Sequence, residues 1–484
     1  MHDALATRTA AAAMDAFRKD VEAELGQGVL VCEPDRVAPY LAELRDLWHG
    51  EAPFVTRPRS TAEVAAILRL AARHRLAVVP QGGNTGLVGG QTPFAGEVVV
   101  STERLDAIEE VDTEGNTMTV GAGTILAAVQ DAADRAGRLF PLSLASEGSA
   151  RIGGLVSTNA GGTQVLAYGN MRDQVLGLEV VLPDGRIWNG LRALRKDNTG
   201  YDLKHLFIGA EGTLGIVTRA VLRIVPKPLA RDVALAGVPS PAAAVSLLGK
   251  VRGALGAGLT GYEIVPRIGV EFVLRHGHGV RNPFAEGIPE WVVLVEASTF
   301  DPERPLRETL ETVLMGAFEA GEVTDAVVSQ SLGEAEDFWR LRELLSEVQR
   351  HEGGSIKHDV SVPVAAVPAF IAEATEAVLA IVPDARPVPF GHVGDGNIHF
   401  NVSQPIGMDK AGFLARWDAV SDAVHAVVRH HRGSIAAEHG VGRLKQALVP
   451  TVRDAVEIDM MRAVKAAFDP EGRMNPGRVL PDTR

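Results

Sequence analysis

The sequence predicts an α+β protein built from two large domains, and three observations carry this prediction. The chain has 484 residues, enough for two or three domains that each bury their own core. In its first half, glycine-rich segments are interleaved with short apolar strands, at 82–90, 146–162 and 207–218. The second half alternates strands with amphipathic helices, a pattern typical of a mostly antiparallel sheet covered by helices; the strands are 234–237 and 291–296, and the helices 242–255 and 304–319.

Composition and charge exclude several classes of protein. The chain is 46% hydrophobic and 23% charged, as in soluble globular proteins, and no apolar run approaches the roughly 20 residues that span a bilayer. A net charge of −13 argues against a nucleic-acid partner, although a local basic pocket can still hold an anionic substrate. Cys32 is the only cysteine, so no intramolecular disulfide can form. We expect a cytoplasmic protein, or a mitochondrial matrix protein if the source is eukaryotic.

The first half begins with residues 1–49, which look helical and most clearly so at 11–25. Ser60 or Thr61 is a good N-cap for a helix reaching about His74. A strand at 77–80 then enters a loop, 82–90, in which five of nine residues are glycine. Such a loop favours a close approach of the backbone to a ligand, and its consecutive N–H groups form an anion nest suited to a pyrophosphate.

The next glycine motif does not predict NAD. Residues 118–126 resemble a strand, a GxGxxG turn and a helix, but Leu126 occupies the third glycine position and no acidic residue follows at the expected distance. Residues 146–162 combine small residues with polar side chains, which suits a wall against a flat, polar-edged ring. After a strand at 178–182, residues 207–218 add a third cluster. Three separated glycine-rich segments suit one long, extended ligand.

A candidate metal site begins at a predicted hairpin, Gly391–Phe400. Asp395-Gly396 is a strong signal for a two-residue type I′ turn, and counting outward from it pairs His392 with His399. Two imidazoles then share one face with Cβ atoms about 5 Å apart, and one metal ion with bonds of about 2 Å can bridge them. Asn401 points to the same face. The alternative is a pair of core histidines beside a glycine turn.

A third ligand is available at Glu438. Two histidines and one carboxylate with an open position form the pattern of a catalytic metal site. Nitrogen and oxygen ligands suit zinc and also accept iron or manganese. The adjacent His439 is the candidate general base, since an imidazole with a pKa of about 6.5 accepts a hydroxyl proton near neutral pH. Alternatively, Glu438 and His439 are a solvated pair at a helix end.

Cationic side chains follow on a predicted helix, 337–348, and a strand, 355–360. Arg342 and Ser346 are four residues apart and project together, while Lys357 and Asp359 share one face of the strand. Taken alone, Arg342 and Lys357 are most simply surface charges paired with neighbouring acids.

These segments together resemble a known family. The motifs that carry the resemblance are Pro80–Gly90, Ile152–Gly162, Leu194–Thr218, Gly391–His399, Glu438–Gly442 and Asp469–Gly477. They are similar to the vanillyl-alcohol oxidase/p-cresol methylhydroxylase flavoproteins, and as a set to the D-2-hydroxyacid dehydrogenase branch, from about residue 50 to the end. The resemblance implies four parts: an N-terminal helical segment (1–49), a two-subdomain FAD-binding domain (50–228), an α+β substrate and metal domain with a mostly antiparallel sheet covered by helices (229–455), and a C-terminal segment returning to the FAD domain (456–484).

The resemblance implies FAD with its pyrophosphate on the first glycine loop. That loop offers Asn84 and Thr85 but no histidine for covalent attachment, so we predict non-covalent FAD. The predicted FAD contacts are Pro80, Gly82, Gly83, Asn84, Thr85, Gly86, Leu87, Gly90, Pro141, Gly148, Ser149, Gly153, Gly154, Ser157, Asn159, Gly161, Glu211, Gly212, Ile216 and Asn475.

The resemblance also assigns a substrate site. In D-2-hydroxyglutarate dehydrogenases an Arg and a Thr on this helix and a Lys on this strand clamp the distal carboxylate. Arg342 and Lys357 match, whereas Ser346 replaces the Thr and leaves the substrate preference open. The implied metal, usually zinc, is bound by His392, His399 and Glu438. Asn401 supports the substrate and His439 removes its hydroxyl proton during hydride transfer to FAD.

Three alternatives remain at this stage. The substrate is a smaller acid such as D-lactate, D-malate or glycolate; or the chain is a metal-dependent hydrolase with purely structural glycine loops; or it is a nucleotide-binding module without catalysis. The expected partners are a small hydroxyacid, an electron acceptor such as electron-transferring flavoprotein or a quinone, and a second copy in a homodimer. We expect no transmembrane segment.

Overall fold

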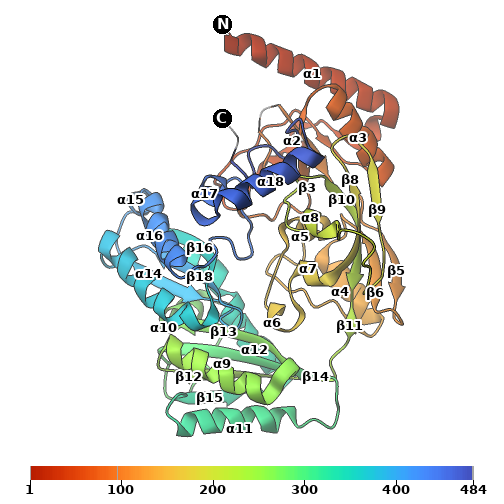
Figure 1. The fold of residues 1–484 in the computed structure, drawn as a ribbon. Coiled ribbons are helices and arrows are strands. Elements are labelled where there is room, and N and C mark those ends of the chain that lie inside the picture. Colours follow the sequence, from red (N-terminus) through yellow and green to blue (C-terminus); the bar gives the residue numbers. More distant parts are fainter. Residues whose placement is uncertain (1, 95, 482–484) are drawn as a thin grey trace. The chain divides into compact units, whose positions relative to one another are not determined.

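The computed structural model describes residues 2–94 and 96–481, with the backbone alone for residues 2–10. The chain folds as two compact units. The first comprises Met1–Gly162, Asn170–Pro226 and Glu438–Arg484, and the second comprises Thr163–Gly169 and Lys227–Ala437. The mixture of helices with mostly antiparallel sheets confirms the predicted α+β class (Figure 1). The predicted boundary at 455 differs from this division, in which Glu438 already begins the last part of the first unit.

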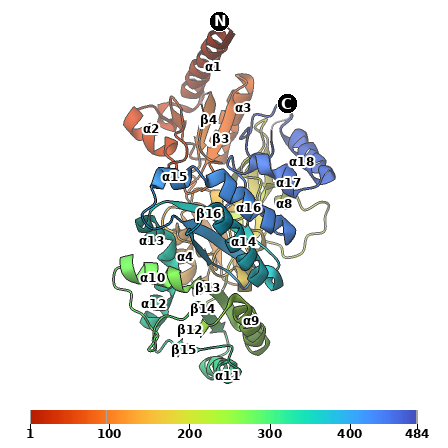
Figure 2. The same ribbon diagram turned by 90° about the vertical axis from the view of Figure 1, so that its left-hand side faces the viewer.

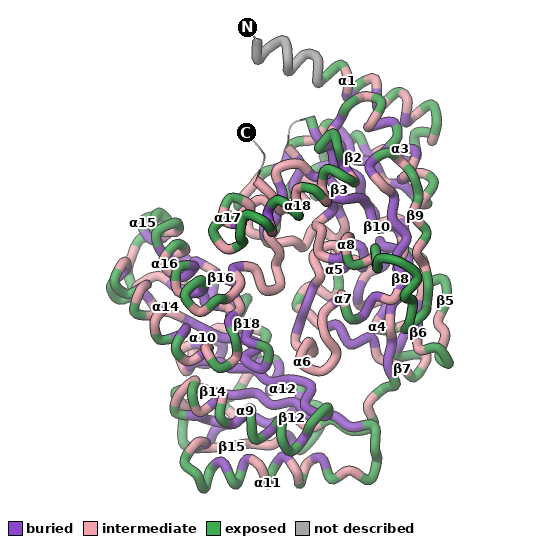
Figure 3. Tube along the Cα trace, in the orientation of Figure 1, coloured by how far each residue is buried: buried purple, intermediate pink, exposed green. Residues whose placement is uncertain are grey.

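The first unit contains two main sheets with different topologies. The smaller has the order β1-β2-β4-β3 and pairs β2, β4 and β3 in parallel. The larger has the order β5-β6-β10-β8-β9 and is antiparallel throughout; Figure 3 shows β8 and β10 largely buried. The strands are β1 (Leu30–Val31), β2 (Val55–Thr56), β3 (Ala77–Gln81), β4 (Glu97–Ser101), β5 (Ile108–Asp112), β6 (Thr117–Gly121), β8 (Val175–Val181), β9 (Ile187–Gly190) and β10 (Ile216–Arg223), with β7 (Arg138–Leu139) and β11 (Val225–Pro226) forming a separate pair.

Helices cover both sheets of the first unit. Helix α3 begins as predicted, because the Ser60 hydroxyl accepts a hydrogen bond from the N–H of Glu63. Its apolar face shares one core with α1, β3 and β4, whereas α5 belongs to a second core under β10. The helices are α1 (His2–Leu25), α2 (Pro34–Leu41), α3 (Thr61–Arg73), α4 (Leu126–Arg135), α5 (Ile152–Thr158), α7 (Met171–Gln174), α8 (Lys204–Phe207), α17 (Val449–Val452) and α18 (Ala455–Phe468).

The second unit is built on two antiparallel sheets with the orders β13-β14-β12-β15 and β16-β18-β17. An isolated bridge between Ile264 and Gly391 links the two sheets, because each residue donates a backbone N–H to the other. The strands are β12 (Ala230–Val238), β13 (Leu259–Pro266), β14 (Trp291–Thr299), β15 (Asp325–Val328), β16 (Ser355–Ser361), β17 (Arg386–Phe390) and β18 (Asn397–Ser403).

Helices pack on both sheets of the second unit. Helices α10 (Arg267–His276) and α12 (Leu332–Glu343) pack on the sheet face that carries Val233, Leu235 and Leu294. Helices α9 (Pro241–Leu255) and α11 (Leu306–Glu319) lie against the same sheet. Figure 2 shows α14 and α16, which pack on each other, with α16 against β16. The helices are α6 (Val165–Tyr168), α9 (Pro241–Leu255), α10 (Arg267–His276), α11 (Leu306–Glu319), α12 (Leu332–Glu343), α13 (Leu345–Val348), α14 (Val367–Ile381), α15 (Lys410–Leu414) and α16 (Trp417–His430).

One stretch of the described residues, Val364–Ile381, is long and apolar enough to cross a membrane by length and composition. It contains α14, which buries Phe370, Ile371 and Val378 within the second unit. The core helix of a globular unit passes the same test, so this stretch is weak evidence for a membrane span.

Candidate functional site

The predicted hairpin exists, but its register differs from the prediction. Strands β17 and β18 pair so that Phe390, and not His392, lies opposite His399. Residues 391–396 form a longer connection in which the N–H groups of Asp395 and Gly396 both donate to the His392 carbonyl. Gly396 has φ 88°, and a Cβ there would lie 2.1 Å from the Val362 carbonyl oxygen. The two-residue turn prediction was therefore wrong, because packing against Val362 sets the shape of this connection.

The two predicted imidazoles are neighbours despite the changed register. The rings of His392 and His399 are 5.5 Å apart between centroids and meet edge to face. His392 Nδ1 lies 2.6 Å from Glu263 Oε1. A carboxylate at that distance favours the tautomer in which Nδ1 carries the proton and Nε2 keeps its lone pair, the usual arrangement of a metal-binding histidine.

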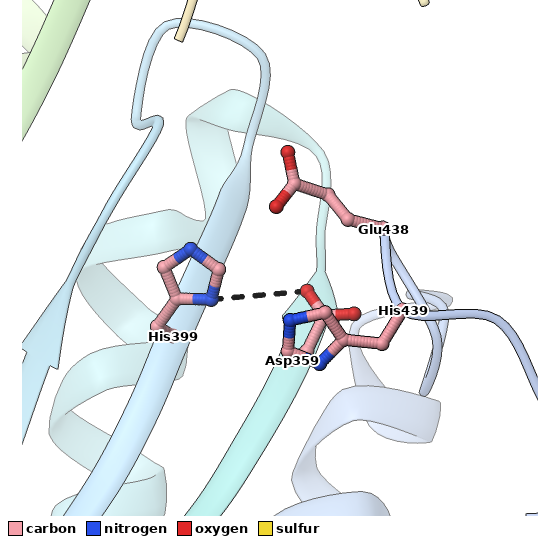
Figure 4. Close-up of side chains that lie close together, drawn as sticks. All are labelled: Asp359, His399, Glu438 and His439. Atoms are coloured by element: carbon pink, nitrogen blue, oxygen red, sulfur yellow. Dashed lines mark ion pairs between the residues drawn. The ribbon is translucent and has the colours of Figure 1, made fainter. Parts of the chain in front are cut away.

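Four side chains form a compact group of ligand atoms, Asp359, His399, Glu438 and His439 (Figure 4). Each offers one nitrogen or oxygen atom, and these atoms all lie within 4.8 Å of one another. Two of the predicted metal ligands, His399 and Glu438, belong to the group, whereas His392 lies beside it through its ring contact with His399. Imidazole and carboxylate donors at this spacing fit Zn²⁺, Fe²⁺ or Mn²⁺.

Strand pairing and chain continuity account for the group. Asp359 on β16 lies directly opposite His399 on β18, with 3.9 Å between Asp359 Oδ1 and His399 Nδ1. The Asn397 amide donates to the same Asp359 oxygen at 3.1 Å. Residues 438 and 439 directly follow Ala437, and nearby Ser434 pairs with Ser361 at the end of β16. Sequence reasoning did not identify Asp359 as a candidate ligand. The pairing of β16 with β18, which places Asp359 opposite His399, is the feature that identifies it.

The predicted substrate residue Arg342 is buried rather than a surface charge. Its side chain is 7% exposed, and Nε lies 2.7 Å from Glu263 Oε2. The guanidinium also stacks over the Phe390 ring, 5.0 Å from the centroid. Burial alone would raise the pKa of Glu263, but its hydrogen bonds and electrostatic interactions with His392 and Arg342 outweigh burial and hold that pKa at about 2. Sequence reasoning missed Glu263; the available signal was a single acid within strand β13, whose other residues are uncharged.

Two other predicted substrate residues, Lys357 and Asn401, lie on β16 and β18, the strands that also carry Asp359 and His399. Lys357 Nζ reaches the Ser346 backbone carbonyl at 3.3 Å, which brings strand β16 and helix α13 together at this point. The Asn401 amide nitrogen donates to Gln349 Oε1 at 2.6 Å, and both residues are buried. The Gln349 amide nitrogen has no hydrogen-bond partner among the described residues, so a buried donor beside Asn401 remains unused.

The first glycine loop presents unused backbone donors. None of the N–H groups of residues 83–90 donates to an acceptor among the residues that the structure describes. Gly83 packs so closely on the second glycine-rich segment that a Cβ there would lie 2.0 Å from the Ser149 carbonyl oxygen. In that segment a Cβ on Gly154 would meet nothing within 4 Å. Unbonded N–H groups near the open position at Gly154 fit the phosphates and ring of FAD.

Several other predicted FAD contacts bond to the protein itself. The Asn84 amide donates to the carbonyls of Pro39 and Ala42, and the Asn475 amide to those of Gly90 and Glu211. The side-chain oxygen Oδ1 of Asn159 accepts from the Arg172 N–H, and the Ser157 hydroxyl donates to the Gly153 carbonyl. These hydrogen bonds hold the four side chains against the protein's own backbone.

Glu211 has a further role within the first unit. Its carboxylate accepts hydrogen bonds from the N–H groups of Val441 at 2.7 Å and Gly442 at 2.8 Å, just beyond His439 and Gly440. Burial raises the pKa of Glu211, and these two hydrogen bonds together with Lys445 oppose that rise. The carboxylate therefore anchors the segment that follows the candidate base.

Known proteins resemble the chain over nearly its whole length. Residues 52–190 match the family "FAD binding domain", and residues 227–479 match "FAD linked oxidases, C-terminal domain". The chain is 39% identical over 455 residues to a D-2-hydroxyglutarate dehydrogenase of Xanthomonas citri, covering 93% of this chain and 94% of that protein. It is 37% identical to a probable mitochondrial D-2-hydroxyglutarate dehydrogenase of Oryza sativa, covering 95% and 80%.

Solved structures share the fold. p-Cresol methylhydroxylase with substrate bound superposes with a TM-score of 0.76 at 16% identity, covering 97% of both chains. Alkyldihydroxyacetonephosphate synthase gives a TM-score of 0.73 at 18% identity, covering 95% of this chain and 85% of that one. The chain therefore belongs to the FAD-linked oxidoreductases of the vanillyl-alcohol oxidase/p-cresol methylhydroxylase type, in the D-2-hydroxyacid dehydrogenase branch.

Proposed function

We propose that this protein oxidises D-2-hydroxyglutarate to 2-oxoglutarate with non-covalent FAD and one divalent metal ion. The main support for this proposal is the position of two side chains. The buried Arg342 and the candidate metal ligand His392 are both bonded to Glu263. A buried cation near a metal site suits a substrate with one carboxylate at each end. The names of the relatives, D-2-hydroxyglutarate dehydrogenases at 35–39% identity, support the same substrate.

The protein's own residues bind and orient the substrate in this proposal. His392, His399 and Glu438 hold the metal, with Asp359 within reach of the same ion. Arg342, Ser346 and Lys357 hold the distal carboxylate, and Asn401 donates to the hydroxyacid end. These contacts set which face of the substrate Cα is presented for reaction.

Proton and hydride leave the substrate separately. A neutral His439 imidazole accepts the hydroxyl proton at a ring nitrogen. A bound divalent metal, zinc in the first instance, supplies Lewis acidity that lowers the pKa of the hydroxyl. Bound FAD supplies the acceptor for the hydride from Cα, at flavin N5. The N–H groups of residues 83–90 are the proposed pyrophosphate site.

Several finer points belong to the same proposal. Electron-transferring flavoprotein or a quinone reoxidises the flavin, and the protein works as a homodimer. It resides in the cytoplasm, or in the mitochondrial matrix if eukaryotic, as several relatives from eukaryotes are named mitochondrial. D-lactate, D-malate and glycolate remain the alternative substrates, and Ser346 in place of the family's Thr is the feature that keeps them open.

An anaerobic substrate screen tests the proposal. Purified protein is mixed with D- and L-2-hydroxyacids, and the loss of flavin absorbance is followed. We expect D-2-hydroxyglutarate to bleach the flavin fastest and its L-enantiomer not at all. Faster bleaching by D-lactate would move the assignment to the smaller acid, and a flavin that no 2-hydroxyacid bleaches would contradict the proposal.

A further inference from the structure

Glu263 is a buried acid that belongs to none of the predicted metal, substrate or FAD contacts. It lies in β13, all of whose residues are buried, and its side chain is 1% exposed. A carboxylate so enclosed is expensive to bury unless charged or hydrogen-bonded partners compensate it. Glu263 has two such partners, and they come from different elements of the second unit.

Backbone pairing brings the first partner to Glu263. The neighbouring residue Ile264 exchanges both backbone hydrogen bonds with Gly391, at 2.9 and 3.0 Å, which places the following residue His392 beside Glu263. The connection is held again at Gly394, whose carbonyl accepts from Arg252 Nη2 at 3.0 Å. The 2.6 Å contact from Glu263 Oε1 to His392 Nδ1 is therefore supported by hydrogen bonds on both sides of His392 in this connection.

Helix α12 supplies the second partner. Arg342 Nε donates to Glu263 Oε2 at 2.7 Å, and the guanidinium lies over Phe390, which is adjacent to the same loop. Because Nε makes the only hydrogen bond of this guanidinium among the described residues, Nη1 and Nη2 remain as a pair of donors. Such a pair matches the two oxygens of a carboxylate.

We propose that Glu263 is a positioning residue. One of its carboxylate oxygens orients the proposed metal ligand His392, and the other orients Arg342, which binds the distal carboxylate of the substrate. Its Oε1 holds the His392 tautomer that leaves Nε2 for the metal, and its Oε2 orients the Arg342 fork. The Glu263 carboxylate would thereby set the distance between the site for the hydroxyacid end of the substrate and the site for its distal carboxylate. Glu263 then selects the chain length of a dicarboxylate. This inference rests on the proposed function, which makes His392 a ligand and Arg342 a clamp.

Glu263→Gln tests both arms, because one amide cannot accept from two donors as a carboxylate does. Zn²⁺ affinity is measured on the FAD-bound protein by competition with a fluorescent chelator, and steady-state rates are measured on D-2-hydroxyglutarate and D-lactate. We expect about 10- to 100-fold weaker Zn²⁺ binding. We also expect KM to rise about tenfold more for D-2-hydroxyglutarate than for D-lactate, because D-lactate lacks the distal carboxylate.

Glu296→Gln is the matched control. Glu296 is a buried acid on the adjacent strand β14, and its carboxylate bonds to Arg231, Thr260 and Trp339. We expect this variant to lose stability while Zn²⁺ affinity and the KM ratio of the two acids stay as in the wild type. Equal effects of the two variants would reduce Glu263 to a structural role and overturn the proposal.

A second set of variants keeps the test decisive if Glu263→Gln folds poorly. Glu263→Gln combined with Arg342→Met removes both members of the buried pair, and the expected loss of Zn²⁺ affinity persists. Arg342→Met alone leaves His392 its carboxylate, so Zn²⁺ affinity is expected to stay within about threefold of the wild type. Unchanged affinity in the double variant overturns the inference. Unchanged affinity in His392→Ala instead overturns the ligand assignment of the proposed function.

Discussion

Lys357 is the residue at which the choice between a diacid and a smaller acid becomes measurable. It stands on β16 two residues before Asp359, so one face of this strand carries both a proposed clamp and a metal-ligand candidate. Its Nζ also reaches the Ser346 carbonyl, which steers the ammonium toward the residue that replaces the family's Thr. A single cation at this place affects only substrates long enough to reach it.

Lys357→Ala is expected to lower kcat/KM for D-2-hydroxyglutarate about 10- to 100-fold, since a hydrogen bond to a charged group contributes about 1.5–3 kcal/mol. For D-lactate we expect less than a threefold change. Steady-state kinetics on both acids provide the measurement, with Arg350→Ala as control because Arg350 is an exposed cation paired with Glu347. Equal losses on the two acids would count against the clamp.

At the scale of elements, one acid ties three segments of the second unit together. Glu352 ends the turn after α13 and accepts from Arg386 of β17 and from Arg275 and His276 of α10. Burial alone would raise the pKa of Glu352, but these hydrogen bonds and charges hold that pKa at about 2. Its side chain is 9% exposed, so solvent screens these bonds little.

Glu352→Gln is expected to destabilise the second unit at pH 7 by at most about 3 kcal/mol, the free energy that corresponds to a pKa held at about 2 rather than 4.5. Because the folded-state pKa is depressed, this stability is fully present above pH 4.5 and is lost as pH falls toward 2. Urea unfolding at pH 7 and pH 3 measures the difference, which should shrink at pH 3. Glu347→Gln, at an exposed ion pair, is expected to change stability by less than about 0.5 kcal/mol at either pH.

Helix α5 offers a test of the FAD site that does not depend on turnover. A Cβ on Gly154 would meet nothing within 4 Å, so a larger side chain there enters only the space proposed for FAD. Gly154→Leu is expected to leave the melting temperature of the FAD-free protein unchanged or raised, since leucine favours helix, and to weaken FAD binding more than tenfold. Flavin absorbance and far-UV circular dichroism give both values. Gly253→Leu, at an equally open helical glycine of α9, should retain FAD.

At the scale of the whole molecule, the two compact units carry different parts of the proposed chemistry. The predicted FAD contacts belong to the first unit, whereas His392, His399, Arg342 and Lys357 belong to the second. Glu438 and His439 stand at the change from one unit to the other, where the chain re-enters the first. Cofactor binding and metal binding should therefore be separable by experiment.

Chelation is expected to abolish turnover and to leave FAD bound, because the proposed pyrophosphate contacts are backbone N–H groups of residues 83–90. Activity with D-2-hydroxyglutarate and protein-bound flavin are measured before and after dialysis against a chelator, and Zn²⁺ is then added back. Return of activity with the metal is the expected control result. Full activity in metal-free protein would rule out the proposed role of the metal.

Local chemistry was enough to predict much of the first unit from sequence. The Ser60 cap, the strand at 77–81 and the glycine loop after it depend on residues close together in the chain, and helix capping or glycine conformation determines them. The same holds for α9, α11 and β14, whose apolar periodicity is intrinsic to each segment. Sequence motifs also identified the family, because they lie in short continuous stretches.

Only the tertiary structure decided the partners of those motifs. The Asp-Gly turn signal predicted one register for His392 and His399, yet packing of Gly396 on Val362 imposed another. Asp359 joined the ligand group through strand pairing, and Glu263 reached His392 across 129 positions of sequence. Propensity acts within a few residues, whereas the burial of charge is settled by whichever distant side chains folding brings into contact.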